Sequence, residues 1–167
     1  TITQGDVLLG IASNGLHTNG YSLARRVFRV EEDPSILNRT YPELGRTLGE
    51  ALLEPHRCYY PLLEPVLPLI KGMAHITGGG LPENVPRVLP KGLGAWFDTS
   101  AWEVPPIFAL IQEAGQVERE EMFQVFNMGV GMVLACAREK TNEVRLLLPE
   151  ACVVGEVVMG GEVALSR

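Results

Sequence analysis

Short apolar runs alternate with amphipathic segments along this chain. Residues 7–12, VLLGIA, form a continuous apolar run, which is typical of a strand buried on both faces. Residues 105–115 place apolar side chains at helical spacing behind two prolines and end at a glycine. By these criteria strands are expected over residues 7–12, 73–77, 93–98, 128–137, 153–158 and 162–165. Helices or helical turns are expected over residues 22–28, 42–53, 82–89, 105–115, 119–126 and 141–148.

This order of elements favours an α+β (layered α/β) domain in which helices pack on a mixed sheet. The last two strands flank Gly160 and Gly161, so the pattern predicts an antiparallel hairpin there. Four prolines between residues 55 and 68 exclude one long regular helix from that segment but allow short helical turns.

Two glycine-rich turns interrupt this pattern. Residues 13–20, SNGLHTNG, follow the first strand and lead to a helix, and residues 77–80, TGGG, follow the second strand. Glycine lets successive backbone N–H groups converge on an anion, and hydroxyl and amide side chains add donors for phosphate or ribose oxygens. The alternative is ordinary turn chemistry with no ligand. Neither turn has the Walker A or the Gly-x-Gly-x-x-Gly pattern.

The histidines and carboxylates do not identify a catalytic or metal site by themselves. His17 lies in the first turn, His75 lies beside the second, and His56 lies in the proline-rich segment. A lone histidine is more often structural than catalytic, and no close pair of carboxylates or Ser-His-Asp arrangement can be inferred from spacing. The spacing predicts no metal site.

Composition narrows the class of protein. The chain has 167 residues, which suits one domain, and a net charge of -6 with scattered basic residues, which argues against nucleic-acid binding. No apolar run is long enough to cross a membrane. Cys58, Cys136 and Cys152 are far apart and form no Cys-x-x-Cys pair, so we expect a reducing, cytoplasmic compartment. The chain begins without a methionine or a basic leader, as a fragment of a longer protein would.

Three long segments carry a more specific signal. GDVLLGIASNGLHTNGYSLARRV, MAHITGGGLPENVPRVLP and FNMGVGMVL, followed by VVGEVV, occur in the order found in one family. Together they resemble the C-terminal half of the aminoimidazole ribonucleotide synthetases, also called phosphoribosylformylglycinamidine cyclo-ligases. The resemblance covers essentially the whole chain.

The resemblance implies a fold and an activity. The fold would be a mixed sheet with helices packed on it, partly ferredoxin-like. The family closes the imidazole ring of formylglycinamidine ribonucleotide with ATP, giving aminoimidazole ribonucleotide, ADP and phosphate in purine biosynthesis. Its N-terminal half binds ATP and Mg²⁺ and forms the homodimer. Residues 1–167 would then be the single C-terminal, substrate-side domain, inactive without its own N-terminal domain.

The resemblance also places both glycine turns on the substrate cleft. His17 would be the catalytic acid or base, and Asn84 is a weaker candidate for a ligand contact. The residues expected to bind substrate or phosphate are Ser13, Asn14, Gly15, Asn19, Gly20, His75, Thr77, Gly78, Gly79, Gly80 and Arg87.

Two alternatives stay open. The chain could be a phosphate-ligand binding module without chemistry. It could also be another member of the same ATP-dependent superfamily: a formylglycinamidine synthetase, selenophosphate synthetase, thiamine-phosphate kinase or hydrogenase maturation protein. The segment HITGGGLPENVPR favours the cyclo-ligase over these relatives.

Overall fold

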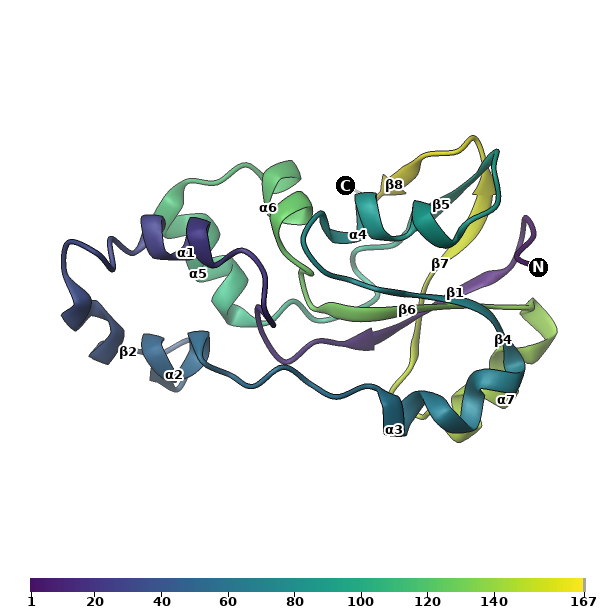
Figure 1. The fold of residues 1–167 in the computed structure, drawn as a ribbon, viewed down its shortest axis with the longest axis horizontal. Helices are drawn as coiled ribbons and strands as arrows, with labels where there is room; N and C mark the ends of the chain where they lie inside the picture. The colour runs from purple at the N-terminus through teal and green to yellow at the C-terminus, as the bar shows by residue number, and fades with distance from the viewer. Residues whose placement is uncertain (167) are drawn as a thin grey trace.

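The computed structural model describes residues 1–166, which form a six-stranded sheet covered by helices, with a small separate hairpin (Figure 1). The α+β class expected from the sequence is confirmed. In the large sheet the strand order is β4-β6-β1-β7-β5-β8. Its strands are β1 (Val7–Ala12), β4 (Ile70–His75), β5 (Leu93–Phe97), β6 (Val130–Cys136), β7 (Cys152–Met159) and β8 (Val163–Leu165).

The helices are short, and most lie where the apolar spacing predicts them. The proline-rich segment breaks into α3 and a 3-10 turn, as expected. The α-helices are α1 (Tyr21–Val27), α2 (Leu48–Leu52), α3 (Tyr60–Leu63), α4 (Gly80–Asn84), α5 (Pro106–Gly115), α6 (Arg119–Val125) and α7 (Thr141–Leu147). The 3-10 helices are η1 (Pro34–Asn38), η2 (Glu64–Leu69), η3 (Pro86–Val88) and η4 (Arg138–Lys140).

Helices cover both faces of the central strands. One apolar core contains Leu8 and lies against α1, α2, α4, α5 and α6. The other contains Leu9 and Ile11 and lies against α3, η2 and α7. In Figure 1, α3 and α7 lie on one side of the sheet and α4 and α6 on the other. Burial on both faces explains why β1 and β6 are continuous apolar runs rather than alternating ones.

The four strands β4, β6, β1 and β7 are antiparallel to their neighbours, with helices between β1 and β4 and between β6 and β7. These four strands have the order of a ferredoxin-like βαββαβ fold, but α4, β5, α5 and α6 are inserted between β4 and β6, so the fold is only partly ferredoxin-like. Both β1 and β4 pair antiparallel with β6, so they run in the same direction. Their C-terminal ends therefore reach the same end of the sheet, and the two glycine turns begin there.

The expected hairpin between the last two strands is wrong. β5 lies between β7 and β8, and β8 pairs in parallel with β5, with Ala95 opposite Val163. The Gly160 N–H donates to the carbonyl of Gly92, so the chain passes around the start of β5 instead of returning along β7. A Cβ at Gly94 would lie 2.1 Å from the Glu162 carbonyl oxygen, so glycine is needed for this close approach.

The expected helix over residues 42–53 is also wrong in its first half. β2 (Thr40–Tyr41) and β3 (Arg46–Thr47) form a small hairpin there, and Gly45 has a φ of 64° in its turn. Helix α2 starts at Leu48 because Thr47 and Glu50 form a capping box. This local signal, Thr-x-x-Glu behind a glycine, outweighs the leucine spacing that suggested a longer helix.

Two further observations bear on the composition. No helix within residues 1–166 is both long and apolar enough to span a membrane. All three cysteines are free, and Cys136 is buried in the core, as expected from its apolar surroundings.

Candidate functional site

The two glycine turns meet at the end of the sheet. A Cβ added to Gly78 in the second turn would lie 3.3 Å from Oδ1 of Asn19 in the first. The ring centroids of His17 and His75 are 6.4 Å apart. The fold therefore brings together two segments that are about sixty residues apart in the sequence.

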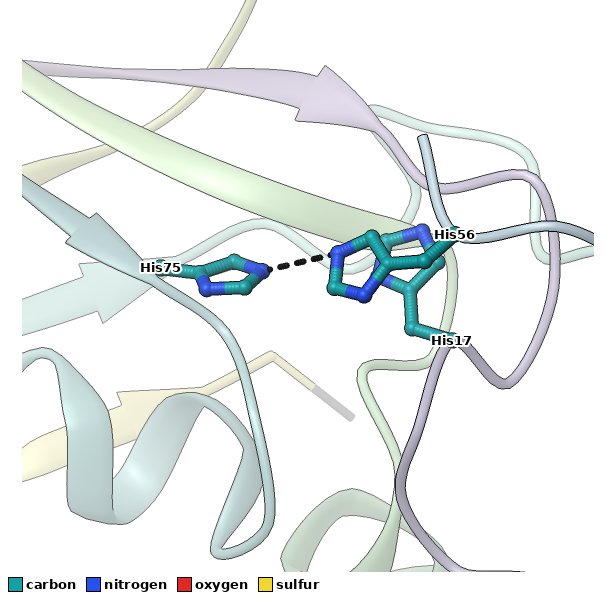
Figure 2. A group of neighbouring side chains, drawn as sticks. All are labelled: His17, His56 and His75. Atoms are coloured by element: carbon teal, nitrogen blue, oxygen red, sulfur yellow. Dashed lines mark hydrogen bonds between the residues drawn. The ribbon is translucent and has the colours of Figure 1, made fainter. Parts of the chain in front are cut away.

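A third segment, which contains His56, lies beside His17 and His75. This position was not predicted from the sequence. His56, in the stretch between α2 and α3, stacks on His17 with ring centroids 4.0 Å apart and planes 10° apart. Its Nε2 lies 3.2 Å from Nε2 of His75 (Figure 2). No spacing rule links these histidines, since each comes from a different part of the chain.

His17 has an unusual environment. His17 is 3% exposed, and its backbone has a φ of 59°, a left-handed conformation that is uncommon for residues other than glycine. Burial, followed by the charges of His56, His75 and Arg57, lowers the pKa of His17 to about 4. The imidazole is therefore neutral near pH 7. Burial and His56 also lower the pKa of His75.

The tautomer of His17 follows from its partners. The Asn14 amide NH₂ donates to the Pro55 carbonyl at 2.7 Å, so the Asn14 oxygen Oδ1 faces His17 Nε2, at 3.0 Å. An oxygen there requires that Nε2 carry the proton. Nδ1 then holds a free lone pair, and this buried atom has no hydrogen-bond partner within residues 1–166.

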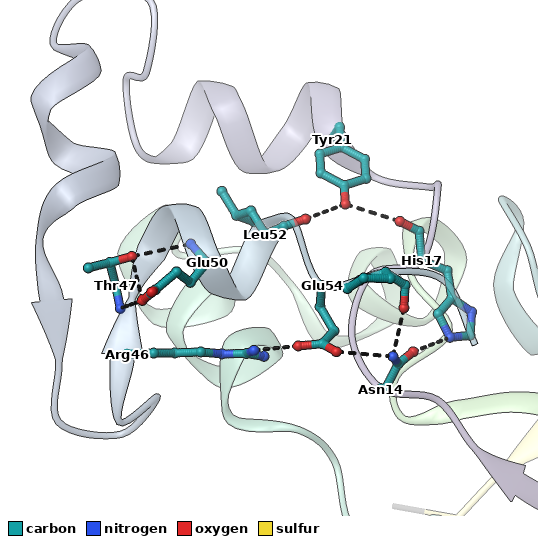
Figure 3. A network of polar contacts seen from close by, with 9 residues as sticks. Asn14, His17, Tyr21, Arg46, Thr47, Glu50, Leu52 and Glu54 are labelled. Carbon is teal, nitrogen blue, oxygen red and sulfur yellow. Dashed lines mark hydrogen bonds and ion pairs between the residues drawn. The ribbon is translucent and has the colours of Figure 1, made fainter.

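A chain of polar contacts holds Asn14 in this orientation (Figure 3). Its NH₂ group also donates to Glu54 Oε1 at 3.4 Å, and Arg46 forms an ion pair with the other Glu54 oxygen. Arg46 and Glu54 thus hold the Asn14 amide in place, and the Asn14 amide in turn determines which nitrogen of His17 carries the proton.

Two tyrosines support the same turn. The Tyr59 hydroxyl donates to the Ala12 carbonyl at 3.1 Å and lies 3.4 Å from His17 Nε2; burial raises the pKa of Tyr59 to about 12. The Tyr21 hydroxyl contacts the carbonyl oxygens of His17 and Leu52. Gly131 of β6 leaves room for the Tyr59 ring, because a Cβ on Gly131 would lie 1.7 Å from the Tyr59 oxygen.

Some of the residues expected to contact a ligand have a structural part in the first turn. The buried Ser13 hydroxyl donates to Asn127 Oδ1 at 2.7 Å, and the Asn127 amide donates to the Gly15 carbonyl at 2.8 Å. Gly20 has a φ of 79°, and a Cβ there would overlap Phe126. Asn127 was not among the residues expected from the sequence, although its side chain holds this turn through hydrogen bonds to Ser13 and Gly15.

In the second turn, Asn84 is an internal brace. Its amide donates to the carbonyls of Gly78 and Gly80, and its oxygen accepts from Thr77 and from Arg87. Arg87, in η3, thus points back at the preceding helix α4, where it also lies near Glu83. The N–H groups of Gly78 and Gly79 have no hydrogen-bond acceptor within residues 1–166, so they remain available to a ligand.

The comparisons with known proteins agree with the resemblance. The family model "AIR synthase related protein, C-terminal domain" matches residues 3–166. The phosphoribosylformylglycinamidine cyclo-ligase of Caldicellulosiruptor bescii is 48% identical over 168 residues, covering 95% of this chain and 48% of that protein. The enzyme of the same name from Geobacillus sp. is 50% identical over 171 residues, covering 99% of this chain and 49% of that protein. The chain spans about half the length of these relatives.

Solved structures with the same fold come from proteins with different names. Thiamine-monophosphate kinase from Stenotrophomonas maltophilia K279a matches with a TM-score of 0.63 at 12% identity, covering 99% of this chain and 51% of that one. Escherichia coli HypE, a hydrogenase maturation protein, matches with a TM-score of 0.61 at 23% identity, covering 100% and 48%. At these identities the likeness shows the fold alone. The family match over residues 3–166 is what identifies the chain as a member of the AIR synthase related proteins, corresponding to their C-terminal domain.

Proposed function

We propose that this chain is the substrate-side half of a phosphoribosylformylglycinamidine cyclo-ligase. The observation that carries the proposal is the identity of 48% and 50% to proteins of that name over 95% and 99% of the chain. In this reaction ATP phosphorylates the amide oxygen of formylglycinamidine ribonucleotide, a nitrogen closes the imidazole ring, and phosphate leaves. The single domain of residues 1–167 would contribute one wall of the cleft.

The glycine turns are proposed to hold the ribose phosphate. The free N–H groups of Gly78 and Gly79 and the side chain of Asn19 lie together where the two turns meet. Backbone N–H groups in glycine-rich turns suit an anion because they carry partial positive charge without a bulky side chain. The remaining expected residues, Ser13, Gly15, Gly20, Thr77 and Gly80, would shape these turns rather than reach the ligand.

His17 is proposed to act on the substrate through Nδ1. The atom is neutral and has a free lone pair, so it accepts a hydrogen bond or a proton and cannot donate one near pH 7. Closure of the imidazole ring requires that the attacking nitrogen lose a proton. Because an imidazole with a pKa of about 4 is a weak base near pH 7, His17 would hold that N–H by a hydrogen bond, whereas His75 and Asn14 would orient groups around it.

ATP and Mg²⁺ are proposed to bind mainly on the other half of the enzyme. Within residues 1–166, the one group of potential metal ligands close enough together consists of three histidines. Mg²⁺ prefers oxygen ligands, so these residues do not fit it. The partners would be formylglycinamidine ribonucleotide and the chain's own N-terminal domain, and the complete enzyme would be a homodimer.

Calorimetric titration of this chain with formylglycinamidine ribonucleotide, and in parallel with ATP, tests the proposal. We expect binding of the ribonucleotide, no binding of ATP, and loss of ribonucleotide binding in Asn19→Ala. Asn142→Ala, on the exposed face of α7, is the matched control. Binding of ATP without binding of the ribonucleotide would contradict the proposal, because it would place the ATP site on this half of the enzyme. Equal binding of inorganic phosphate and ribonucleotide would favour a simple phosphate module.

A second experiment tests the activity itself. The N-terminal half of the Geobacillus relative is mixed with this chain, and ADP release is measured with the ribonucleotide present. We expect no turnover from either half alone and measurable turnover from the mixture. Turnover by this chain alone would show that the ATP site lies on it.

A further inference from the structure

The chain contains three histidines, and the fold gathers all three into one cluster. Each ring offers a nitrogen atom, and these atoms lie within 4.8 Å of one another. We propose that His17, His56 and His75 form a binding site for a divalent transition-metal ion such as zinc, cobalt or nickel, with a fourth position open to solvent or ligand. This inference does not rest on the proposed function.

The separation of His56 and His75 matches a shared metal ion. Their Nε2 atoms are 3.2 Å apart (Figure 2). Two imidazole nitrogens on one tetrahedral zinc ion lie about 3.3 Å apart, since each Zn–N distance is about 2.0–2.1 Å. Two facing Nε2 atoms can be this close only if one of them carries a proton. A metal ion would take the place of that proton.

His17 has the features of the third ligand. Its Nε2–H is committed to the Asn14 oxygen at 3.0 Å, which leaves Nδ1 as the ligand atom. Nδ1 is buried and has no partner within residues 1–166, although buried polar atoms nearly always have one. A ligating histidine usually donates its other N–H to an oxygen that fixes the ring, and Asn14 provides that oxygen here.

One ring must turn for all three nitrogens to converge. The rings of His17 and His56 are stacked with planes 10° apart, so their lone pairs do not yet point at one spot. His56 lies in a stretch between α2 and α3 without helix or strand, and its contact with His75 is solvent-exposed. Rotation of the His56 side chain therefore disturbs no core packing.

The donor set selects the kind of metal. Neutral imidazoles suit zinc, copper, nickel and cobalt, whereas Mg²⁺ and Ca²⁺ require oxygen ligands. The guanidinium of Arg57, next to His56, is paired with Glu150, so its charge opposes a cation only partly. Three protein ligands with one open position is the arrangement that leaves room for an exchangeable water or a ligand.

Titration of the whole chain, produced without a histidine tag, with Co²⁺ and with Zn²⁺ tests the site. We expect one equivalent of Co²⁺ to give the visible absorption bands of a four-coordinate cobalt ion, and Zn²⁺ to displace it. His56→Gln and His75→Gln, both accessible side chains, should each weaken Zn²⁺ binding at least tenfold without changing the far-ultraviolet circular dichroism. His17→Gln should do the same, with the fold checked by thermal melting.

The control is Cys58→Ser, which removes an exposed thiol two residues from His56. We expect Zn²⁺ binding by this variant to equal that of the parent chain. No binding of Co²⁺ or Zn²⁺, binding unchanged in His56→Gln and His75→Gln, or binding lost in Cys58→Ser would each overturn the proposal.

Discussion

The side-chain oxygen of Asn14 lies 3.0 Å from Nε2 of His17, three residues further along the same turn. This contact decides which nitrogen of the imidazole carries the proton. It leaves Nδ1 buried and free. The proposed contact with the substrate and the proposed metal site both use the one lone pair of Nδ1, so they exclude each other in a single molecule. The contact depends in turn on Glu54 and Arg46, which hold the Asn14 amide in place.

The low pKa of His17 should make stability depend on pH. The pKa is about 4 in the folded chain against an ordinary value of 6.5, so the unfolded chain binds more protons between these values. The free energy of unfolding should therefore fall as pH decreases from 6.5 to 4, by about 1–3 kcal/mol from this residue.

Urea unfolding at pH 7 and at pH 5, for the parent chain and His17→Gln, measures this effect. His75 contributes in the same direction, so the difference between the two proteins isolates His17. Identical pH dependence in both proteins would contradict the prediction.

Asn14→Asp should raise the pKa of His17. A carboxylate beside Nε2 stabilises the imidazolium, which the present amide does not. The measurement is an NMR titration of the histidine Cε1–H signals, with His56→Gln and His75→Gln backgrounds used for assignment. Asn142→Asp, on α7, adds the same charge far from the turn and should leave the signal of His17 nearly unchanged.

Gly131→Ala should destabilise the chain through Tyr59. The new Cβ would lie 1.7 Å from the Tyr59 oxygen and 2.9 Å from His17 Cε1, so the ring must move. We expect a cost of about 2–3 kcal/mol, the range of overpacked cores. In Tyr59→Leu, which removes the obstructing hydroxyl, Gly131→Ala should cost clearly less. Additive effects of the two substitutions would show that the cost has another origin.

Gly80→Ala and Gly45→Ala form a matched pair. Both glycines have positive φ, 57° and 64°, but a Cβ at Gly80 would lie 1.8 Å from the Phe123 carbonyl, whereas Gly45 has open space around it. Gly45→Ala should cost about 1 kcal/mol from the backbone conformation alone. Gly80→Ala should cost at least about 2 kcal/mol more, measured by thermal or urea unfolding. Equal costs would mean that α4 shifts away from α6 freely.

The elements that the sequence predicts well are those whose signal is local. β1 and β6 are buried on both faces, so each is a continuous apolar run that marks its own boundaries. The helix expected over residues 42–53 failed because leucine spacing was given more weight than Gly45 and the capping residues Thr47 and Glu50. Those capping residues were readable in the sequence.

Other features depend on contacts that no local pattern contains. The parallel pairing of β8 with β5 joins residues near 95 to residues near 163, and the hairpin expectation considered only neighbours in the chain. The sequence singled out His17 and His75 because glycine turns surround them. His56 lies in no glycine turn. Its ring stacks on His17 because of the way the segment between α2 and α3 folds.

The pairing of β8 has a consequence for how the chain assembles. Within residues 1–166, β7 pairs with one edge of β5 and β8 with the other, so β5 has an open edge until residues 163–165 pair with it. An open edge strand can capture a strand from another polypeptide. Pairing of β8 therefore closes this edge of β5 and leaves a three-residue strand, in place of the five residues of β5, at this border of the described sheet.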